Sequence, residues 1–375
     1  MVNQDVFCVK ISGAAGQGIK SIGLILAKLA IRSGYHVYNY IEYPSLIRGG
    51  HNVMYINISK REVLAPKKEA DLEVDLLKES NIVAVGKIVQ KLGGDFELYK
   101  KLLIEEYGEI RDELVVVDKE NDLLKPVEGD KGKVLINAND AVALGAISAG
   151  LQFAAIYPMS PASGILHTLA KYQNDFGYIY KQPEDEIAAI NMAIGASFAG
   201  ARSLTATSGG GFSLMVEGLG LAAISETPVV IVDVMRPGPA TGMPTWSGQG
   251  DLKFVLSASQ DEFPRIVFAL GDAKEAYELT QTAFNLADKY QLPAIILSDK
   301  NLADNDQSFS DFGQNNFEFD RGKFSTEKFA NYKRYALSEN GVSLRTIPGS
   351  GNHILATSYE HDESGFASEE IIFYI

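Results

Sequence analysis

Small hydroxyl side chains and two prolines follow a short apolar run in the stretch Tyr157-Pro-Met-Ser160-Pro-Ala-Ser163. The run, residues 151–156, is typical of a strand. The prolines fix φ and restrict the residues before them, so a helix cannot start early. Tyr157, Pro158 and Ser160 are therefore expected at the carboxyl tip of a strand, which is the edge where open α/β sheets bind ligands.

A second candidate is an arginine that follows the β-branched strand expected at 228–234. It begins the segment Arg236-Pro-Gly-Pro-Ala-Thr-Gly-Met-Pro-Thr245, in which prolines and glycines hold the backbone. A guanidinium in this position is suited to gripping a carboxylate through two parallel hydrogen bonds. The alternative is an arginine that only stabilises its own loop.

Two further stretches stand at the starts of predicted helices. The acids Glu184, Asp185 and Glu186 precede a helix of small residues at 187–199, where acidic side chains commonly just complement the helix dipole. The turn Ser208-Gly-Gly-Gly211 precedes the helix expected at 212–225. Ser208 and Gly209 are expected either to line a cofactor pocket or to form a helix cap followed by a flexible turn.

A glycine loop opens the chain between a strand expected at 6–11 and a helix expected at 19–33. Backbone N–H groups around Gly13, Gly16 and Gly18 are suited to holding an anion. The spacing is GxxGxG rather than the dinucleotide-binding GxGxxG, however, so a tight turn that binds nothing is an equal reading. The five histidines have no metal-ligand spacing, and no metal site is predicted.

These candidates need elements that position them, and strand-like and helix-like segments alternate along most of the chain. That alternation predicts an α/β protein with two parallel-sheet domains, each sheet covered by helices on both faces. The predicted division is a first domain at 1–120, a charged linker at 121–135, a second domain at 136–305 and an irregular extension at 306–375.

Several of these stretches together resemble the 2-oxoacid:ferredoxin oxidoreductases, which are thiamine-diphosphate enzymes. Tyr157–Ser163 resembles their YPITPSS motif, and the Arg236 segment resembles their RPGPSTGxPT loop. The loop Gly13–Gly18 and the segment Tyr43-Pro-Ser-Leu-Ile-Arg48-Gly-Gly50 resemble their gamma domain. The resemblance implies an alpha subunit of the 2-oxoglutarate type with a fused N-terminal gamma domain. Such a subunit would consist of a Rossmann-like gamma-type domain followed by a pyrimidine-binding domain, and it would lack the usual C-terminal domain.

The resemblance also implies roles for individual residues. Glu186 takes the place of the catalytic glutamate that contacts N1′ of the thiamine aminopyrimidine. Arg236 takes the place of the arginine that binds the 2-oxoacid carboxylate, and Thr245 and Ser160 contact its oxygens, with Ser160 replacing the usual threonine. The implied cofactor-binding residues are Tyr157, Pro158, Ser208 and Gly209. The residues implied near coenzyme A are Gly13, Gly16, Gly18 and Arg48.

Two missing features imply a partner. The chain contains no Gly-Asp-Gly, the start of the motif that holds Mg²⁺ and the diphosphate in thiamine enzymes. It has one cysteine, Cys8, whereas an iron–sulfur cluster needs about four thiolates. The resemblance therefore implies a beta subunit that carries the diphosphate-binding domain, Mg²⁺ and a [4Fe–4S] cluster, and that docks ferredoxin. Together the subunits would convert a 2-oxoacid and coenzyme A to an acyl-CoA.

Composition narrows the remaining classes. The net charge of −14 argues against nucleic-acid binding and against docking on anionic lipid. No apolar run approaches the roughly 20 residues that span a bilayer, and the lone cysteine and non-basic start favour the cytoplasm. Three alternatives remain: a non-redox thiamine-dependent decarboxylase component, a nucleotide-binding regulatory protein, and an inactive truncated subunit.

Overall fold

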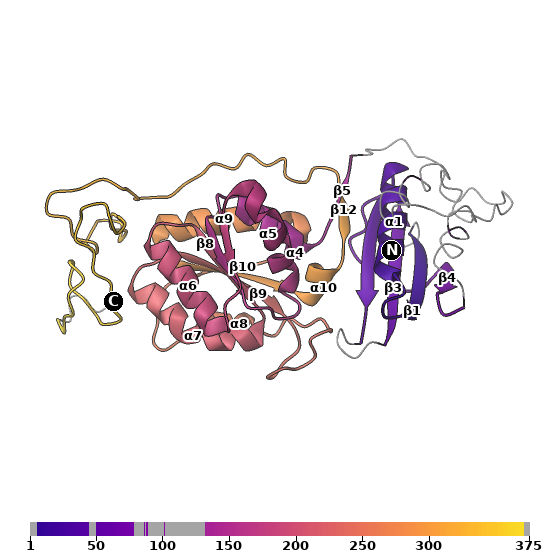
Figure 1. Cartoon of the computed structure of the whole chain (residues 1–375), viewed down its shortest axis with the longest axis horizontal. Coiled ribbons are helices and arrows are strands. Elements are labelled where there is room, and N and C mark those ends of the chain that lie inside the picture. The colour runs from indigo at the N-terminus through magenta and orange to yellow at the C-terminus, as the bar shows by residue number, and fades with distance from the viewer. Residues whose placement is uncertain are drawn as a thin grey trace. The chain divides into compact units, whose positions relative to one another are not determined.

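The computed structural model of the chain describes residues 6–44, 50–78 and 132–370, together with Gly86, Ile88 and Lys101. The chain divides into two compact units (Figure 1). The first comprises Met1–Asn137 and Asp304–Gln314, and the second comprises Ala138–Ala303 and Asn315–Ile375. Within the described residues, no helix is both long and apolar enough to cross a membrane.

The first unit is built on a six-stranded sheet with the order β4-β1-β3-β2-β12-β5. Helix α1 (Ile19–Arg32) packs on it through an apolar stripe that includes Ile22, Ile25 and Leu29. The strands are β1 (Phe7–Ala14), β2 (His36–Glu42), β3 (His51–Ser59), β4 (Leu72–Asp75), β5 (Val134–Ile136) and β12 (Gln307–Phe309).

Strand directions in this sheet differ from the predicted ones. The α/β class is confirmed, but only the β1–β4 pair is parallel among the strand pairs that the structure describes here. Only residues 43–50 separate β2 from β3, and a parallel pair needs a crossover of about a dozen residues or more. The short connection therefore makes β2 and β3 antiparallel neighbours.

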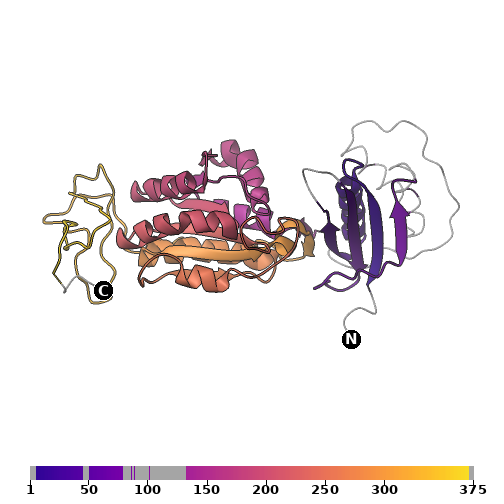
Figure 2. The same cartoon turned by 90° about the horizontal axis from the view of Figure 1, so that it is seen from below.

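The second unit has the predicted parallel sheet, with the order β10-β11-β9-β8-β6-β7. All seven residues of β9 and of β11 are buried, as expected for a sheet covered on both faces. Figures 1 and 2 show the two helix layers, with α4, α5 and α9 on one side and α6, α7 and α8 on the other. The strands are β6 (Phe153–Ala155), β7 (Ile179–Lys181), β8 (Ser203–Thr207), β9 (Val229–Met235), β10 (Ile266–Ala269) and β11 (Pro293–Asp299). The helices are α4 (Ala138–Ser148), α5 (Ser163–Phe176), α6 (Glu186–Phe198), α7 (Gly209–Ile224), α8 (Leu252–Ser257), α9 (Ala273–Tyr290) and α10 (Lys300–Asp304).

The predicted domain limits of 136 and 305 lie within two residues of where the structure divides. The linear order differs, because residues 304–314 return to the first unit and there supply β12. Strand β5 crosses the end of the predicted linker at 135, and most of that linker falls outside the described residues. The segment 315–370 has no helix or named strand, whereas the first residues of the predicted irregular extension, which starts at 306, form β12.

A buried aspartate fastens this irregular segment to α9. Asp288 accepts hydrogen bonds from Nε of Arg202 at 2.9 Å and from Nε of Arg321 at 2.9 Å. It also accepts one from Nη2 of Arg345 at 3.1 Å. Burial lowers the pKa of Arg345 to about 10, and the charge of Asp288 opposes that shift. One carboxylate therefore binds guanidinium groups from three separate segments.

Replacing Asp288→Asn should lower the free energy of unfolding by about 3–5 kcal/mol, because it leaves buried arginines without their counter-charge. Lys289→Gln is the matched control, since Lys289 forms an ion pair with Asp320 in which both side chains are nearly half exposed. It should cost less than about 1 kcal/mol. Urea denaturation followed by circular dichroism would measure both, and equal losses would contradict this account of the cluster.

Candidate functional site

The carboxyl edge of the parallel sheet holds the residues that the sequence singles out. Ser160 follows β6, Arg236 follows β9, and Glu186 is the first residue of α6. Nη1 of Arg236 donates a hydrogen bond to the backbone oxygen of Ser160 at 2.5 Å. Burial lowers the pKa of Arg236, and the charge of Glu186 opposes that shift. The structure thus brings Ser160, Glu186 and Arg236 together from two loops and one helix start.

Glu186 is a buried acid at a helix start. Asp185 caps α6 by accepting a hydrogen bond from the backbone N–H of Ala188 at 2.7 Å, which leaves Glu186 to point elsewhere. The Glu186 side chain is 3% exposed, and its Oε1 is buried without a hydrogen-bond partner. Burial raises the pKa of Glu186, while its own backbone N–H and the charge of Arg236 act in the opposite direction. The acid is therefore ready to exchange a hydrogen bond with a ligand.

The glycine turn, residues 207–211, packs directly on this carboxyl group. A Cβ atom at Gly211 would lie 2.1 Å from Oγ1 of Thr207 and 2.6 Å from Oε1 of Glu186, distances that real Cβ atoms do not adopt. Oγ1 of Thr207 also donates to Sδ of Met159 at 3.7 Å, which links the turn to the Tyr157 stretch. The sequence pointed to the glycines of this turn, but not to Thr207.

The other predicted cofactor and substrate residues lie on the same loops. Tyr157 is half-buried and Pro158 is exposed beside it. Ser208 is fully buried with a partnerless Oγ, and Gly209 follows it at the start of α7. Thr245 is half-buried in the Arg236 loop, which we define as residues 236–251.

In the first unit, the predicted anion loop is occupied by its own glutamine. Oε1 of Gln17 accepts a hydrogen bond from the backbone N–H of Ala14 at 2.6 Å, and Nε2 donates to Leu76. Gly16 and Gly18 have positive φ angles of 89° and 79°, which explains why glycine stands there. Gly13 lies at the end of β1, and Arg48 lies outside the described residues.

Two acids in this region were missed by the sequence reasoning. Asp233, on β9, has a fully buried side chain, and both of its carboxyl oxygens lack a hydrogen-bond partner. Burial raises its pKa well above the usual range, and the charge of Asp251 adds to the shift. Oδ2 of Asp251 is also buried without a partner. The available signal for Asp233 was a single charged residue inside an otherwise apolar strand.

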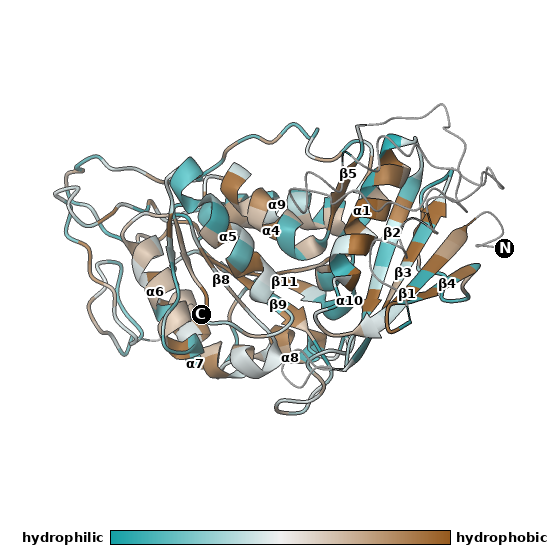
Figure 3. Cartoon of the chain, turned by 45° about the vertical axis from the view of Figure 1, so that its right-hand side comes forward, coloured by the Kyte–Doolittle hydropathy of each residue, from teal (hydrophilic) through white to brown (hydrophobic). Residues whose placement is uncertain are grey.

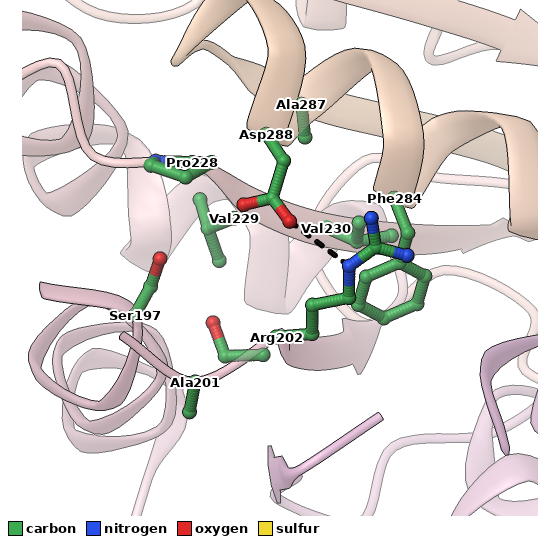
Figure 4. A pocket seen from close by; sticks show the side chains of 10 residues that line it. Ser197, Ala201, Arg202, Pro228, Val229, Val230, Phe284, Ala287 and Asp288 are labelled. Atoms are coloured by element: carbon green, nitrogen blue, oxygen red, sulfur yellow. Dashed lines mark hydrogen bonds and ion pairs between the residues drawn. The ribbon is translucent and has the colours of Figure 1, made fainter. Parts of the chain in front are cut away.

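A small cavity lies away from these residues, at the amino ends of β8 and β9 (Figure 4). Its lining includes Arg202 and Asp288, whose ion pair Figure 4 shows, together with Ser203. The cavity has a volume of about 10 Å³, which is room for roughly one water molecule. It is therefore too small for a substrate, and the candidate site remains at the opposite edge of the sheet.

Comparison with protein families decides which known group the chain resembles. The family model described as pyruvate flavodoxin/ferredoxin oxidoreductase, thiamine diphosphate-binding, matches residues 144–372, more than half of the chain. The chain belongs to this family. A second model, described as pyruvate ferredoxin/flavodoxin oxidoreductase, matches residues 8–80. Each of the two units of this family member therefore contains a stretch that matches an oxidoreductase model. The resemblance read from the sequence is confirmed.

Individual relatives of this family member are similar over long stretches. A 2-oxoacid:ferredoxin oxidoreductase alpha subunit of Sulfurisphaera tokodaii is 37% identical over 352 residues, covering 86% of this chain and 55% of the relative. The 2-oxoglutarate synthase subunit KorA of Archaeoglobus fulgidus is 50% identical over 166 residues, covering 44% of this chain and 48% of the relative. The chain thus spans about half the length of these curated relatives.

A solved structure matches nearly the whole chain. It is the 2-oxoglutarate:ferredoxin oxidoreductase from Magnetococcus marinus with 2-oxoglutarate, coenzyme A and succinyl-CoA bound. The TM-score is 0.87 at 28% identity, and the match covers 99% of this chain and 77% of the other. The two-sheet α/β architecture is therefore shared with an oxidoreductase of the predicted kind.

Substituting Gly211→Ala should destabilise the protein by about 1–3 kcal/mol, because the added methyl group would overpack Thr207 and Glu186. Gly210→Ala is the control in the same turn. Its Cβ would meet only the backbone oxygen of Ala240, at an ordinary 3.5 Å, and the change should be neutral or slightly stabilising. Thermal unfolding of both variants would measure the difference, and similar melting temperatures would refute the proposed crowding.

Asp233→Asn should make stability less dependent on pH. With its pKa raised in the folded state, Asp233 keeps a proton that the unfolded chain loses, so the free energy of unfolding falls as pH rises above the usual carboxyl range. The slope for one proton is about 1.4 kcal/mol per pH unit. Urea titrations at several pH values between 5 and 9 should show a shallower fall in the variant. Asp175→Asn, at an exposed position, should retain the wild-type slope.

Proposed function

We propose that the chain is the alpha subunit, with a fused gamma-type unit, of a 2-oxoacid:ferredoxin oxidoreductase. Its reaction is the coenzyme A-dependent oxidative decarboxylation of 2-oxoglutarate, with reduction of ferredoxin, in the cytoplasm. The observation that carries the proposal is the buried Glu186 carboxyl, with a partnerless oxygen, beside Arg236. The choice of 2-oxoglutarate is supported by the names of the KorA relative and of the Magnetococcus marinus structure.

The described residues fit one half of a thiamine-diphosphate site. Oε1 of Glu186 lacks a partner, and the close approach of Gly211 keeps side-chain bulk away from it. When bound, thiamine diphosphate supplies the carbon nucleophile and the electron sink for decarboxylation of the 2-oxoacid. Glu186 would hold or accept a proton at the aminopyrimidine ring, and Ser208 and Gly209 would line the same wall. Burial raises the pKa of Glu186, so this acid holds a proton more readily than an exposed glutamate does, as its proposed role requires.

Arg236 is the residue that would orient the substrate. Its guanidinium is anchored to the Ser160 backbone, so its position is fixed before the substrate arrives. A fixed guanidinium binds a carboxylate with less loss of side-chain freedom than a mobile one. Ser160 and Thr245 supply hydroxyl groups on the two loops that adjoin it. This arrangement favours an acid as the substrate and leaves the carbon chemistry to the cofactor.

The partner that completes the site would be a beta subunit carrying the diphosphate-binding domain, Mg²⁺, the [4Fe–4S] cluster and the ferredoxin contact. An uncharged face next to Glu186 supports such a partner. Residues 187–201 contain no charged side chain, although Ile187 and Met192 of α6 are 47% and 38% exposed. Leu214 of α7 is 49% exposed, and Figure 3 shows both helices largely without strongly hydrophilic colour. We assign coenzyme A to the gamma-type unit, which contains Gly13, Gly16, Gly18 and Arg48.

The proposal is tested by co-expressing the chain with a beta-type partner and measuring coenzyme A-dependent reduction of a viologen dye. 2-Oxoglutarate should be the preferred acid over pyruvate and branched 2-oxoacids. Carbon dioxide release without dye reduction would instead indicate a non-redox decarboxylase component. Failure to assemble with the partner, or no reaction with any acid, would overturn the proposal.

Two substitutions should separate the roles in that assay. Glu186→Gln should lower kcat by about 10²–10⁴-fold with little change in KM, because a proton-transferring group is lost. Arg236→Ala should mainly raise KM, by about 10–100-fold, because a charged hydrogen-bonding partner of the substrate is lost. Glu184→Gln is the control, since Glu184 is exposed two residues away and should have no effect. Equal mild effects of the first two changes would show that the site is misassigned.

A further inference from the structure

Two carboxyl groups to which the proposed reaction gives no role, those of Asp233 and Asp251, lie against the glycine turn. Asp233 on β9 is the register partner of Thr207 on β8, so the two side chains share one face of the sheet. Ile231 and Met235 lie two residues before and after Asp233, so their side chains point to the same face of β9. Both belong to the hydrophobic core that includes residues of α6, α7 and α8. Asp233 therefore points toward these helices, under the start of α7.

The second carboxyl group lies on top of the same turn. A Cβ atom on Gly209 would be 2.5 Å from Oδ2 of Asp251, so this carboxyl group rests directly against the glycine backbone. Asp251 also ends the Arg236 loop and starts α8, where its backbone oxygen accepts a hydrogen bond from Val255 at 2.8 Å. Only Ser208 separates Gly209 from Thr207, the neighbour of Asp233. Asp233 and Asp251 thus meet the turn from two sides.

Neither group has the partners that a buried carboxylate requires. Both oxygens of Asp233 and Oδ2 of Asp251 are buried without a hydrogen-bond partner. The other charged groups on adjoining elements are Glu186 on α6, Glu217 on α7, Lys253 on α8, Asp299 on β11, Lys300 and Asp304 on α10, and Arg236. Asp299 already accepts hydrogen bonds from Nε2 of Gln249 and the backbone N–H of Asn301.

Burial of an unpaired carboxylate favours the protonated form, and two neighbouring carboxylates repel each other. Burial raises the pKa of Asp251, and for Asp233 the charge of Asp251 adds to the effect of burial. When Asp233 holds its proton it is neutral, and only the charge of Asp251 remains next to the turn.

We propose that Asp233 is a positioning residue held as a neutral acid, and that its proton keeps Asp251 seated on Gly209. Loss of this proton places two negative charges against one glycine turn and releases the end of the Arg236 loop. The other end of that loop carries Arg236, so its release also loosens the guanidinium. The first half of the loop is closed internally by a hydrogen bond from the backbone N–H of Met243 to the oxygen of Pro237 at 2.9 Å, next to Arg236.

The chain supplies its own probe for this movement. Its single tryptophan, Trp246, lies on the Arg236 loop and is 63% exposed. Fluorescence anisotropy of Trp246 in the 375-residue chain should fall in one transition as pH is raised above the usual carboxyl range, because the released loop moves faster. Asp233→Asn keeps a neutral group of the same shape, so the variant should hold the closed value or shift the midpoint upward by more than about one pH unit.

Matched variants decide between this role and a merely structural one. Asp251→Asn removes the other charge and should also abolish the transition, whereas Asp175→Asn, at an exposed position, should titrate as the wild type does. Circular dichroism at pH 6 checks that every variant is folded. If Asp233→Asn and Asp251→Asn both titrate as the wild type does, the proposal is wrong.

The effect on substrate binding rests on the proposed function and is measured separately. With the beta-type partner present, KM for 2-oxoglutarate should increase as pH rises. The increase should be about tenfold larger in the wild type than in Asp233→Asn. The dependence of kcat on pH should be the same in both proteins. A flat wild-type KM profile would overturn the link between the loop and Arg236. If no dye reduction occurs at all, the proposed function fails, and the Trp246 measurement still decides the role of Asp233.

Discussion

Burial of β9 and β11 on both faces is the constraint on which the second unit depends. Every residue of these two strands is buried, so a charged group within them has no access to water. Polar chemistry is therefore confined to the strand ends, where loops and helix starts surround it. At the carboxyl edge this produces the group of Ser160, Glu186 and Arg236, and at the amino edge it produces the group around Asp288. Asp233, inside β9, is the exception.

These two edges handle buried charge in opposite ways. Asp288 forms ion pairs with three arginines, and burial lowers the pKa of Arg345 while the charge of Asp288 opposes that shift. Asp233 has no cation in direct contact among the interactions that the structure describes, and burial instead favours its neutral form. The first arrangement stabilises a fixed connection between segments, whereas the second leaves a carboxyl group whose charge depends on its surroundings. Such groups are typical of functional sites.

The sequence predicts the parts of this structure that depend on local residues. The prolines at 158 and 161 mark a loop after a strand, and the segment after Arg236 marks another, because proline and glycine restrict the backbone wherever they stand. The contact between Gly211 and Glu186 joins two helix starts that lie 25 positions apart, and no local pattern specifies it. The same holds for the strand directions of the first sheet, which follow from pairing between distant segments. Asp233 was visible as a charged residue in an apolar strand, but its lack of partners is a property of the assembled core.

The return of residues 304–314 to the first unit has a consequence for synthesis of the chain. Ser308 in β12 accepts a hydrogen bond from the backbone N–H of Val37 through its Oγ, across 271 positions, and Asn305 accepts one from Ile41. A chain that emerges from the ribosome N-terminus first cannot form these contacts until most of its length has been translated. Strand β2 therefore lacks its neighbour β12 until all strands of the second sheet have been synthesised. Contacts of such high sequence separation slow folding, and the edge of β2 stays open to wrong pairing until β12 has been made.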